Sequence, residues 1–324
     1  MSASSPSLWA INYHYVRDLS RTRYPRIRGR LTSDFEQQVA WLSERCEMAT
    51  LESAADFLAG KYEAGRDLCL LTFDDGLKDH YTNVLPILAD RGIQGLFFIC
   101  TVCLEKNYVL PVHKNHFLMA ALEFNEYRKA FLEQLALLTS ETPDTVDVEK
   151  AKLGYPYDSE EVAVFKFFLN YVVAEPLRVR VLDVLFERYF GNEAAFAKEL
   201  YLNWDEAQQM QTGGMIIGGH THNHVALSTL SNEEQAVDLA TCGSVLRKRL
   251  KPQEFWPFCY PYGHSYSFNA ATIQRLKAVG FICAFTTETG SNRPGDDLFT
   301  LRRVDTNDVL KKMQPVQAAV TASK

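Results

Sequence analysis

The chain has 324 residues, of which 47% are hydrophobic and 23% charged, and this balance excludes wholesale disorder. With 34 basic and 40 acidic residues the net charge is −6, so the basic surface expected of a nucleic-acid-binding protein is missing. The most apolar segment, residues 162–174, is too short and too polar to cross a bilayer. The length allows two domains, or one large α/β domain with an insertion.

The first residues contain neither a basic segment nor an apolar run, so we expect no secretory signal and a cytoplasmic protein. The seven cysteines lie mostly in apolar segments, which predicts buried free thiols. Cys100 and Cys103 form a C-x-x-C pair, but neither a second pair nor a thioredoxin-like context supports a zinc or redox site there.

Short apolar segments alternate with amphipathic ones along most of the chain. The segments typical of strands are residues 8–16, 68–73, 95–100, 214–218, 255–260, 281–285 and 299–304. Helices are predicted from an N-cap at Thr32 or Ser33 to about Arg45, after residue 76 through Leu88, and at 232–250 and 268–279. Because the strand segments are apolar throughout, we expect them to be buried on both faces, as in a parallel sheet or an α/β barrel.

Residues 102–202 break this alternation. They contain no clear strand, and helical patterns dominate at 113–138 and 160–190. We therefore predict that 1–101 form the first part of the α/β core, 102–202 a helical insertion, 203–312 the second part of the core, and 313–324 a flexible tail.

Two adjacent carboxylates, Asp74 and Asp75, follow the strand predicted at 68–73. A divalent cation could bind one of them and leave the other as a base, which would relieve their repulsion. The pair could equally be the acidic first turn of a helix, where the helix dipole favours Asp.

Three of the eight histidines, His220, His222 and His224, lie within five residues after another strand-like segment. On one helical turn His220 and His224 would share a face and could bind one ion, whereas His222 would point elsewhere. Two imidazoles and one carboxylate leave coordination positions open, as in catalytic metal sites. The alternative is a solvated loop of histidines.

A third cluster, Tyr260-Pro261-Tyr262-Gly263, could form a groove wall and offer a backbone N–H to a developing oxyanion. Such runs are also common turn formers.

In this order the three clusters resemble the motifs of the polysaccharide deacetylases, the NodB-homology esterases that remove acyl groups from amino sugars. T-F-D-D-G is matched at residues 72–76, H-[ST]-x-x-H at 220–224, and the third motif in part at 260–263. The resemblance covers roughly residues 8–100 and 200–305 and leaves the helical insertion unmatched. It implies a distorted (β/α) barrel of the NodB type.

The resemblance also implies roles for individual residues. Asp75, His220 and His224 would hold a divalent metal, and Asp74 would be the general base. The backbone N–H of Tyr262 would help to form the oxyanion hole, and Thr221 would support the histidine turn. Zinc suits these ligands, although cobalt, nickel or manganese could bind the same set.

Two features depart from the family pattern. Cys259 stands where many members have an Arg that orients the base, and Arg303 could supply this guanidinium from another strand or be a structural arginine. The late Leu-x-His that provides the general acid has no match. His14 resembles an early histidine that acts as acid in rearranged members, although it could also be a core histidine.

The resemblance implies a hydrolase of non-peptide C–N bonds, an N-deacetylase acting on a small or carrier-linked amino sugar in surface-glycan biosynthesis. A deformylase or another amidase would use the same metal site. The two departures also allow an inactive glycan-binding homologue. The helical insertion could cap the cleft or form a homodimer interface.

Overall fold

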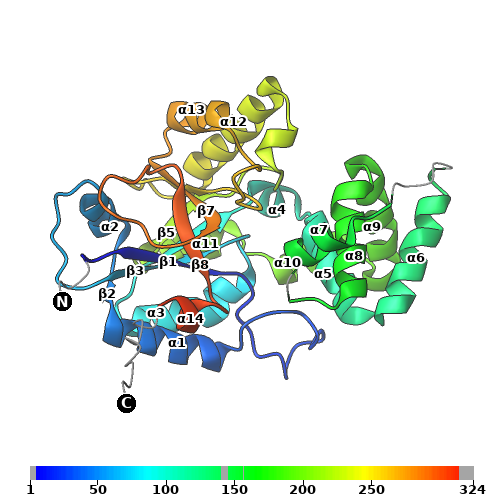
Figure 1. Cartoon of the computed structure of the whole chain (residues 1–324), viewed down its shortest axis with the longest axis horizontal. Helices are drawn as coiled ribbons and strands as arrows, with labels where there is room; N and C mark the ends of the chain where they lie inside the picture. Colours follow the sequence, from blue (N-terminus) through cyan, green and yellow to red (C-terminus); the bar gives the residue numbers. More distant parts are fainter. Residues whose placement is uncertain (1–4, 140–144, 156, 314–324) are drawn as a thin grey trace, which may run out of the picture. The chain divides into compact units, whose positions relative to one another are not determined.

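The computed structural model describes residues 5–139, 145–155 and 157–313, and the chain divides into two compact units (Figure 1). The barrel unit comprises Met1–Arg17, Arg30–Glu105 and Leu200–Lys324, and the helical unit comprises Asp18–Gly29 and Lys106–Glu199. Residues 18–29, which we had placed in the first part of the core, thus belong to the helical unit. The predicted tail, apart from Met313, lies outside the described residues.

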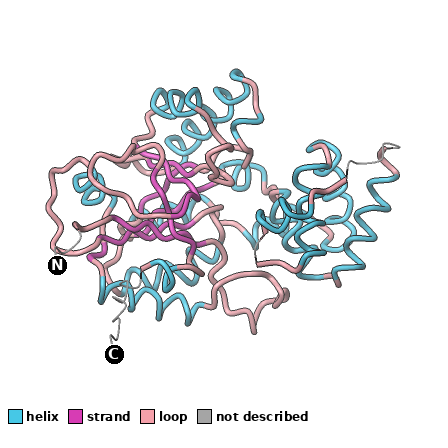
Figure 2. The backbone as a smooth tube through the Cα atoms, in the orientation of Figure 1, coloured by secondary structure: helices cyan, strands magenta, loops and turns pink. Residues whose placement is uncertain are grey.

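Seven parallel strands close into a barrel, shown in magenta in Figure 2. Closure comes from β1, which pairs with β3 on one side and with β8 on the other. A two-residue strand, β2 (Glu47–Met48), extends the sheet from β3. The barrel strands are β1 (Leu8–Tyr13), β3 (Leu68–Phe73), β4 (Gly95–Ile99), β5 (Ile216–Gly219), β6 (Pro257–Cys259), β7 (Cys283–Thr289) and β8 (Leu301–Asp305).

The predicted α/β barrel is therefore confirmed, and each predicted strand segment contains or overlaps one barrel strand. The segment predicted at 8–16 is shorter, because pairing ends at Tyr13. The strand β2 was not predicted, since two residues carry no periodicity.

Helices surround the barrel strands. The helix α1 (Thr32–Arg45) begins without a side-chain cap after Leu31, so the prediction of Thr32 or Ser33 as its N-cap was wrong. The chain after β3 forms a π-helix, His80–Val84, before α3 (Leu85–Asp90). The other helices of this unit are α2 (Leu51–Leu58), α4 (Thr101–Lys106), α11 (Trp204–Thr212), α12 (Asn232–Arg249), α13 (Ala270–Val279) and α14 (Val309–Lys312), with a 3-10 turn at Leu227–Thr229.

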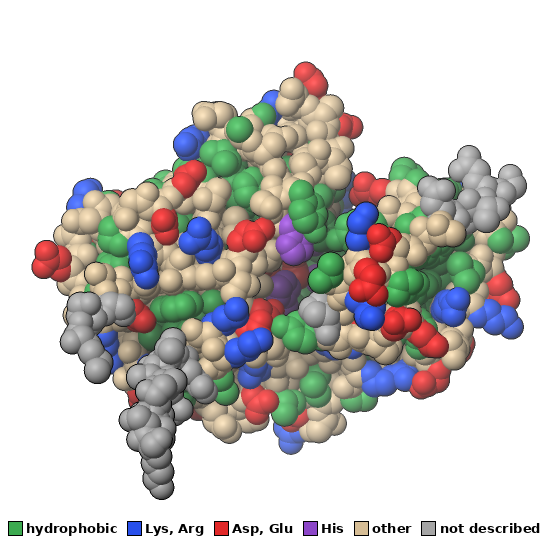
Figure 3. Space-filling model, viewed as in Figure 1, with side chains coloured by type: hydrophobic (Ala, Val, Ile, Leu, Met, Phe, Trp, Pro, Cys, Tyr) green, Lys and Arg blue, Asp and Glu red, His purple; other side chains and the backbone are tan. Residues whose placement is uncertain are grey.

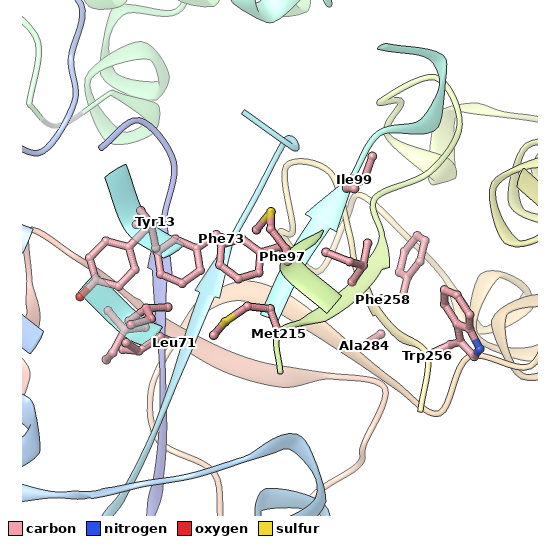
Figure 4. Close-up of a cluster of buried hydrophobic side chains, with 14 of the residues drawn as sticks. Tyr13, Leu71, Phe73, Phe97, Ile99, Met215, Trp256, Phe258 and Ala284 are labelled. Carbon is pink, nitrogen blue, oxygen red and sulfur yellow. The ribbon is translucent and has the colours of Figure 1, made fainter. Parts of the chain in front are cut away.

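Alternate strand residues face two different cores. One cluster lies between the strands and the surrounding helices and contains Tyr13, Phe73 and Phe97, whose rings stack in a row (Figure 4). The other contains the alternate positions, among them Leu70 and Phe98, packed against α2. Because side chains alternate along a strand, this second cluster fills the barrel interior. All seven cysteines are buried and free, as predicted.

The helical unit contains no strand within its described residues. The long helix predicted at 113–138 is two helices, α5 (Pro111–Ala121) and α6 (Phe124–Ala136). The pattern at 160–190 is also interrupted, by a π-helix at Phe168–Val172 between α8 (Glu160–Phe167) and α9 (Glu175–Phe190). The remaining helices are α7 (Val148–Gly154) and α10 (Glu193–Leu200). Across the described chain, every helix is too short or too polar to span a membrane.

Close packing at Gly218 gives a test of the barrel. A Cβ at this position would lie 2.5 Å from the carbonyl oxygen of Pro257 and 2.7 Å from the Phe98 ring. We expect Gly218→Ala to lower the free energy of unfolding by about 1–3 kcal/mol, because the backbone must shift to make room. Gly65→Ala is the control, since its Cβ would meet nothing within 4 Å. Equal denaturation midpoints for the two variants would contradict this packing.

Candidate active site

The functional residues predicted from the sequence meet at the carboxyl ends of the barrel strands, where active sites of α/β barrels lie. His14 follows β1, Asp74 and Asp75 follow β3, and His220 follows β5, while Arg303 lies within β8. All of them belong to the barrel unit.

Asp75, His220 and His224 form a group that could hold a metal ion. The Nε2 atoms of His220 and His224 lie 3.4 Å and 3.3 Å from Asp75 Oδ1, and all three side chains are largely buried. Each offers one ligand atom, and these atoms lie within 4.8 Å of one another. Ligands about 2.1 Å from a tetrahedral ion are roughly 3.4 Å apart, so the spacing and the donor set fit a divalent cation.

The orientation of His220 also suits a metal ligand. Its Nδ1 lies 2.8 Å from the carbonyl oxygen of Cys259. Because a carbonyl can only accept a hydrogen bond, Nδ1 carries a proton, and Nε2 is the ring atom that faces Asp75 and is placed to bind a metal. Metal-binding histidines are commonly held by such a bond from the other ring nitrogen.

The loop that carries the two histidines is not helical, so the predicted sharing of one helical face was wrong. Thr221 and His224 have positive φ angles of 63° and 55°, and this left-handed turn brings the imidazoles together instead. The Thr221 hydroxyl accepts from His224 N–H and donates to the His220 carbonyl, at 2.8 Å and 2.6 Å. His222 contacts Thr101 Oγ1 through Nδ1 at 2.8 Å.

Asp238 of α12, which sequence reasoning missed, holds the same loop. Its carboxylate accepts hydrogen bonds from the backbone N–H groups of His222 and Asn223, at 2.8 Å and 3.1 Å, and from the Asn223 side chain. No sequence motif marks Asp238, since it lies within a regular amphipathic helix.

Arg303, which the sequence analysis names as a possible partner of Asp74, binds the Asp74 carboxylate. Two hydrogen bonds of 2.8 Å join the guanidinium to both carboxylate oxygens, and both side chains are buried. Burial alone would raise the pKa of Asp74, but the charge of Arg303, helped by His220 and His14, lowers it to about 2. Asp74 is therefore ionised at neutral pH.

Cys259 lies beside Asp74, with its Sγ 3.6 Å from Oδ2, and together with His220 it forms a second group of metal-type donors. This group is the weaker candidate. Arg303 already engages both oxygens of Asp74, and burial raises the pKa of the Cys259 thiol, so that the sulfur stays protonated.

His14 stands at the opening of this site and is not a core histidine. Its side chain is 44% exposed, and its Nε2 lies 3.8 Å from Asp74 Oδ2 and 3.9 Å from Asp75 Oδ2. Figure 3 shows that histidine side chains reach the surface of the molecule next to acidic and hydrophobic ones.

Residues at the start of the π-helix hold the backbone around His14. His80 Nε2–H donates to the His14 carbonyl at 3.0 Å, and Asn83 donates to the Val16 carbonyl at 2.7 Å. Asp79 accepts from Val16 N–H and from Arg17 Nε. Burial lowers the pKa of His80 to about 4, so this imidazole is neutral. This arrangement could not be predicted, because a π-helix of five residues is too short to show a period different from that of an α-helix.

Tyr262 follows β6 and has a φ of 64°. Its side chain is 44% exposed, and its ring lies 5.3 Å from that of His224. The predicted use of its backbone N–H in an oxyanion hole stays a prediction.

Comparison with known proteins identifies the family. The polysaccharide deacetylase family model matches residues 61–136 and 174–284, more than half of the chain. The chain therefore belongs to the polysaccharide deacetylase family. The match enters the helical unit, which we had left outside the resemblance.

Solved structures share the fold at low sequence identity. PplD, a deacetylase of Streptococcus pyogenes solved in complex with acetate, is 15% identical with a TM-score of 0.59, over 96% of this chain and 100% of that chain. IcaB from Ammonifex degensii is 20% identical with a TM-score of 0.57, over 95% of both chains. The deacetylase domain of BpsB from Bordetella bronchiseptica is 15% identical with a TM-score of 0.53, over 92% of this chain and 95% of that chain. No curated protein matches the chain.

Removal of one imidazole tests whether Asp75, His220 and His224 bind a metal ion together. We expect His224→Ala to weaken binding of a divalent metal by at least about 100-fold, because an ion would keep only two of its three protein ligands. His222→Ala is the matched control, since this histidine turns toward Thr101. Metal content after dialysis measures both. Equal metal loss in the two variants would contradict the assigned ligand set.

Removal of the guanidinium tests the pairing of Asp74. We expect Arg303→Met to lower the free energy of unfolding by about 3–5 kcal/mol, because a buried carboxylate loses its partner. The pKa of Asp74 should rise above 2 when Arg303 is removed. On acidification, the variant should therefore lose any Asp74-dependent activity at a higher pH than the native chain does. The double variant Arg303→Met/Asp74→Asn should recover part of the stability in chemical denaturation. No recovery would show that the ion pair is not the source of the loss.

Proposed function

We propose that the protein is a metal-dependent hydrolase that removes the N-acetyl group from an amino sugar. The observation that carries this proposal is the group of Asp75, His220 and His224 with Asp74 and His14 beside it, in a member of the polysaccharide deacetylase family. The acetate bound to PplD, a protein of the same fold, is the product that this reaction would release.

A divalent ion held by these three ligands would lower the pKa of water from 15.7 to about 7 and polarise the amide carbonyl. Zinc suits two nitrogens and one oxygen, and cobalt, nickel or manganese could take its place. The carboxylate of Asp74 is the general base and accepts the proton of the attacking water. Its low pKa keeps it ionised, and Arg303 fixes both of its oxygens.

The amide bond breaks when the sugar nitrogen receives a proton. His14 is the proposed donor, because its Nε2 lies within 4 Å of both carboxylates and its ring is open to solvent. The backbone N–H of Tyr262 is proposed to stabilise the oxyanion that develops on the acetyl oxygen. The products are acetate and a free amino sugar.

Release of acetate tests the reaction. The metal-loaded protein should release acetate from N-acetylated amino sugars, whether these are small or linked to a carrier. Asp74→Asn should reduce turnover by about 10²–10⁴-fold, the contribution of a positioned base. Its metal content should stay unchanged, because the three proposed ligands are intact.

Asp90→Asn is the matched control, since the Asp90 side chain is 85% exposed. Formate is measured in the same assay, because a deformylase would use the same residues. Metal binding without release of either acid, from the native chain and Asp74→Asn alike, would favour an inactive glycan-binding homologue. Association through the helical unit stays a separate prediction.

A further inference from the structure

The backbone around His14 lies beyond the end of the barrel sheet. The strand β1 ends at Tyr13, so His14 and Val16 have left the ladder that β1 forms with β3 and β8. The His14 carbonyl instead accepts a hydrogen bond of 3.0 Å from His80, and the Val16 carbonyl accepts one of 2.7 Å from Asn83. Two side chains thus bind the backbone where a neighbouring strand no longer does.

Two further contacts hold the same segment. Val16 N–H donates to Asp79 at 3.2 Å, and the same carboxylate oxygen accepts from Arg17 Nε at 2.7 Å. The backbone N–H of Arg17 donates to the Arg30 carbonyl at 3.0 Å. Because the backbone is fixed on this side, the His14 imidazole can move only by rotation about its own side-chain bonds.

The His80 imidazole is a costly way to fill its place in the core. It is fully buried, and its ring centre lies 5.5 Å and 5.6 Å from those of Phe73 and Phe97. Its Nε2 carries the proton that the His14 carbonyl accepts, and its buried Nδ1 has no hydrogen-bond partner among the described residues. A buried polar atom without a partner costs free energy, and a phenylalanine would pack between the same rings without this cost. The hydrogen bond to His14 is what the imidazole adds.

The two donors belong to one unusual turn. His80 and Asn83 are the first and fourth residues of the π-helix, and Leu85 N–H closes the turn on the His80 carbonyl. Single π-helical turns are rare and occur frequently at functional sites. Here the turn directs both donors to the segment that follows β1.

We propose that His80 and Asn83 are positioning residues that hold His14 beside the two carboxylates of the candidate site. His14 Nε2 lies 3.8 Å from Asp74 Oδ2 and 3.9 Å from Asp75 Oδ2. A misplacement of about 1 Å costs about 100-fold in rate when a group must meet its substrate in one geometry. The proposal rests on the proposed function, in which His14 gives a proton to the sugar nitrogen, and it names the residues that hold this donor in place.

The test compares two substrates with different needs for a proton. An amide releases its nitrogen only when that nitrogen is protonated, whereas 4-nitrophenyl acetate releases a stable anion. For the metal-loaded protein, His80→Phe should lower kcat for an N-acetylated amino sugar by about 10- to 100-fold with KM unchanged. Hydrolysis of 4-nitrophenyl acetate should stay nearly unchanged. A general loss of structure would lower both rates.

Three variants complete the comparison. His80→Gln keeps a donor at Nε2 and should recover most of the amide turnover. Asn83→Ala should act in the same direction as His80→Phe, and it carries the test if His80→Phe does not fold, because Asn83 is only half-buried. Thr82→Ala is the matched control, since Thr82 is an exposed residue of the same turn and its hydroxyl donates to the Lys78 carbonyl.

Hydrogen exchange tests the same hold without turnover. The Val16 amide should exchange about 3- to 10-fold faster in His80→Phe, the effect of losing one hydrogen bond from the segment. Thr82→Ala should leave this rate unchanged. A native chain that releases no acetate from any amide refutes the deacetylase proposal, but faster Val16 exchange in His80→Phe alone would still show that His80 holds the His14 segment.

Two results would overturn the positioning role. The first is an unchanged exchange rate of the Val16 amide in both His80→Phe and Asn83→Ala. The second, in an active chain, is an amide turnover that either stays at the native level in these variants or falls by the same factor as ester hydrolysis.

Discussion

The buried pair of Arg303 and Asp74 is the interaction on which the candidate site depends. Besides both oxygens of Asp74, the Arg303 side chain donates to the Thr286 carbonyl at 2.7 Å and to Asn12 and Thr72 at 3.1 Å and 3.2 Å. Removing two charges from water is costly, and a buried pair persists where further hydrogen bonds satisfy the remaining donors. Here one guanidinium joins β1, β3, β7 and β8 where the barrel closes, and it holds Asp74 next to the metal group.

The fold and the grouping of Asp75, His220 and His224 could be predicted from the sequence because both have local signals. Apolar segments indicated the barrel strands, and adjacent acids or histidines marked the strand ends. Arg303 could be named only as a possible partner of Asp74 or as a structural arginine. The spacing in the sequence does not show that β3 and β8 both pair with β1. The histidine turn was predicted with the wrong backbone, because an i, i+4 spacing does not distinguish a helical turn from a loop with two left-handed residues.

The candidate site concentrates backbone strain. Among the described residues, Asp75, Thr221, His224 and Tyr262 have positive φ angles, and Asn107 is the only other residue with a side chain that does. Each such conformation costs of order 1–3 kcal/mol and persists only where its surroundings impose it. The hydroxyl of Thr221, the carboxylate of Asp238 and the close approach of Gly263 to Thr287 supply that constraint. The rigid barrel supports these strained turns, and the turns position the side chains of the candidate metal site.

The chain order of the site has a consequence for biosynthesis. Asp74 is translated early, whereas its guanidinium partner arrives only with β8, which follows the other described strands along the sequence. Until then the carboxylate lacks its arginine partner, and the barrel lacks the strand that closes it against β1. A nascent chain can therefore complete the Asp74 pair and close the barrel only after β8 has been synthesised, and cleavage before β8 would remove both features from a mature molecule.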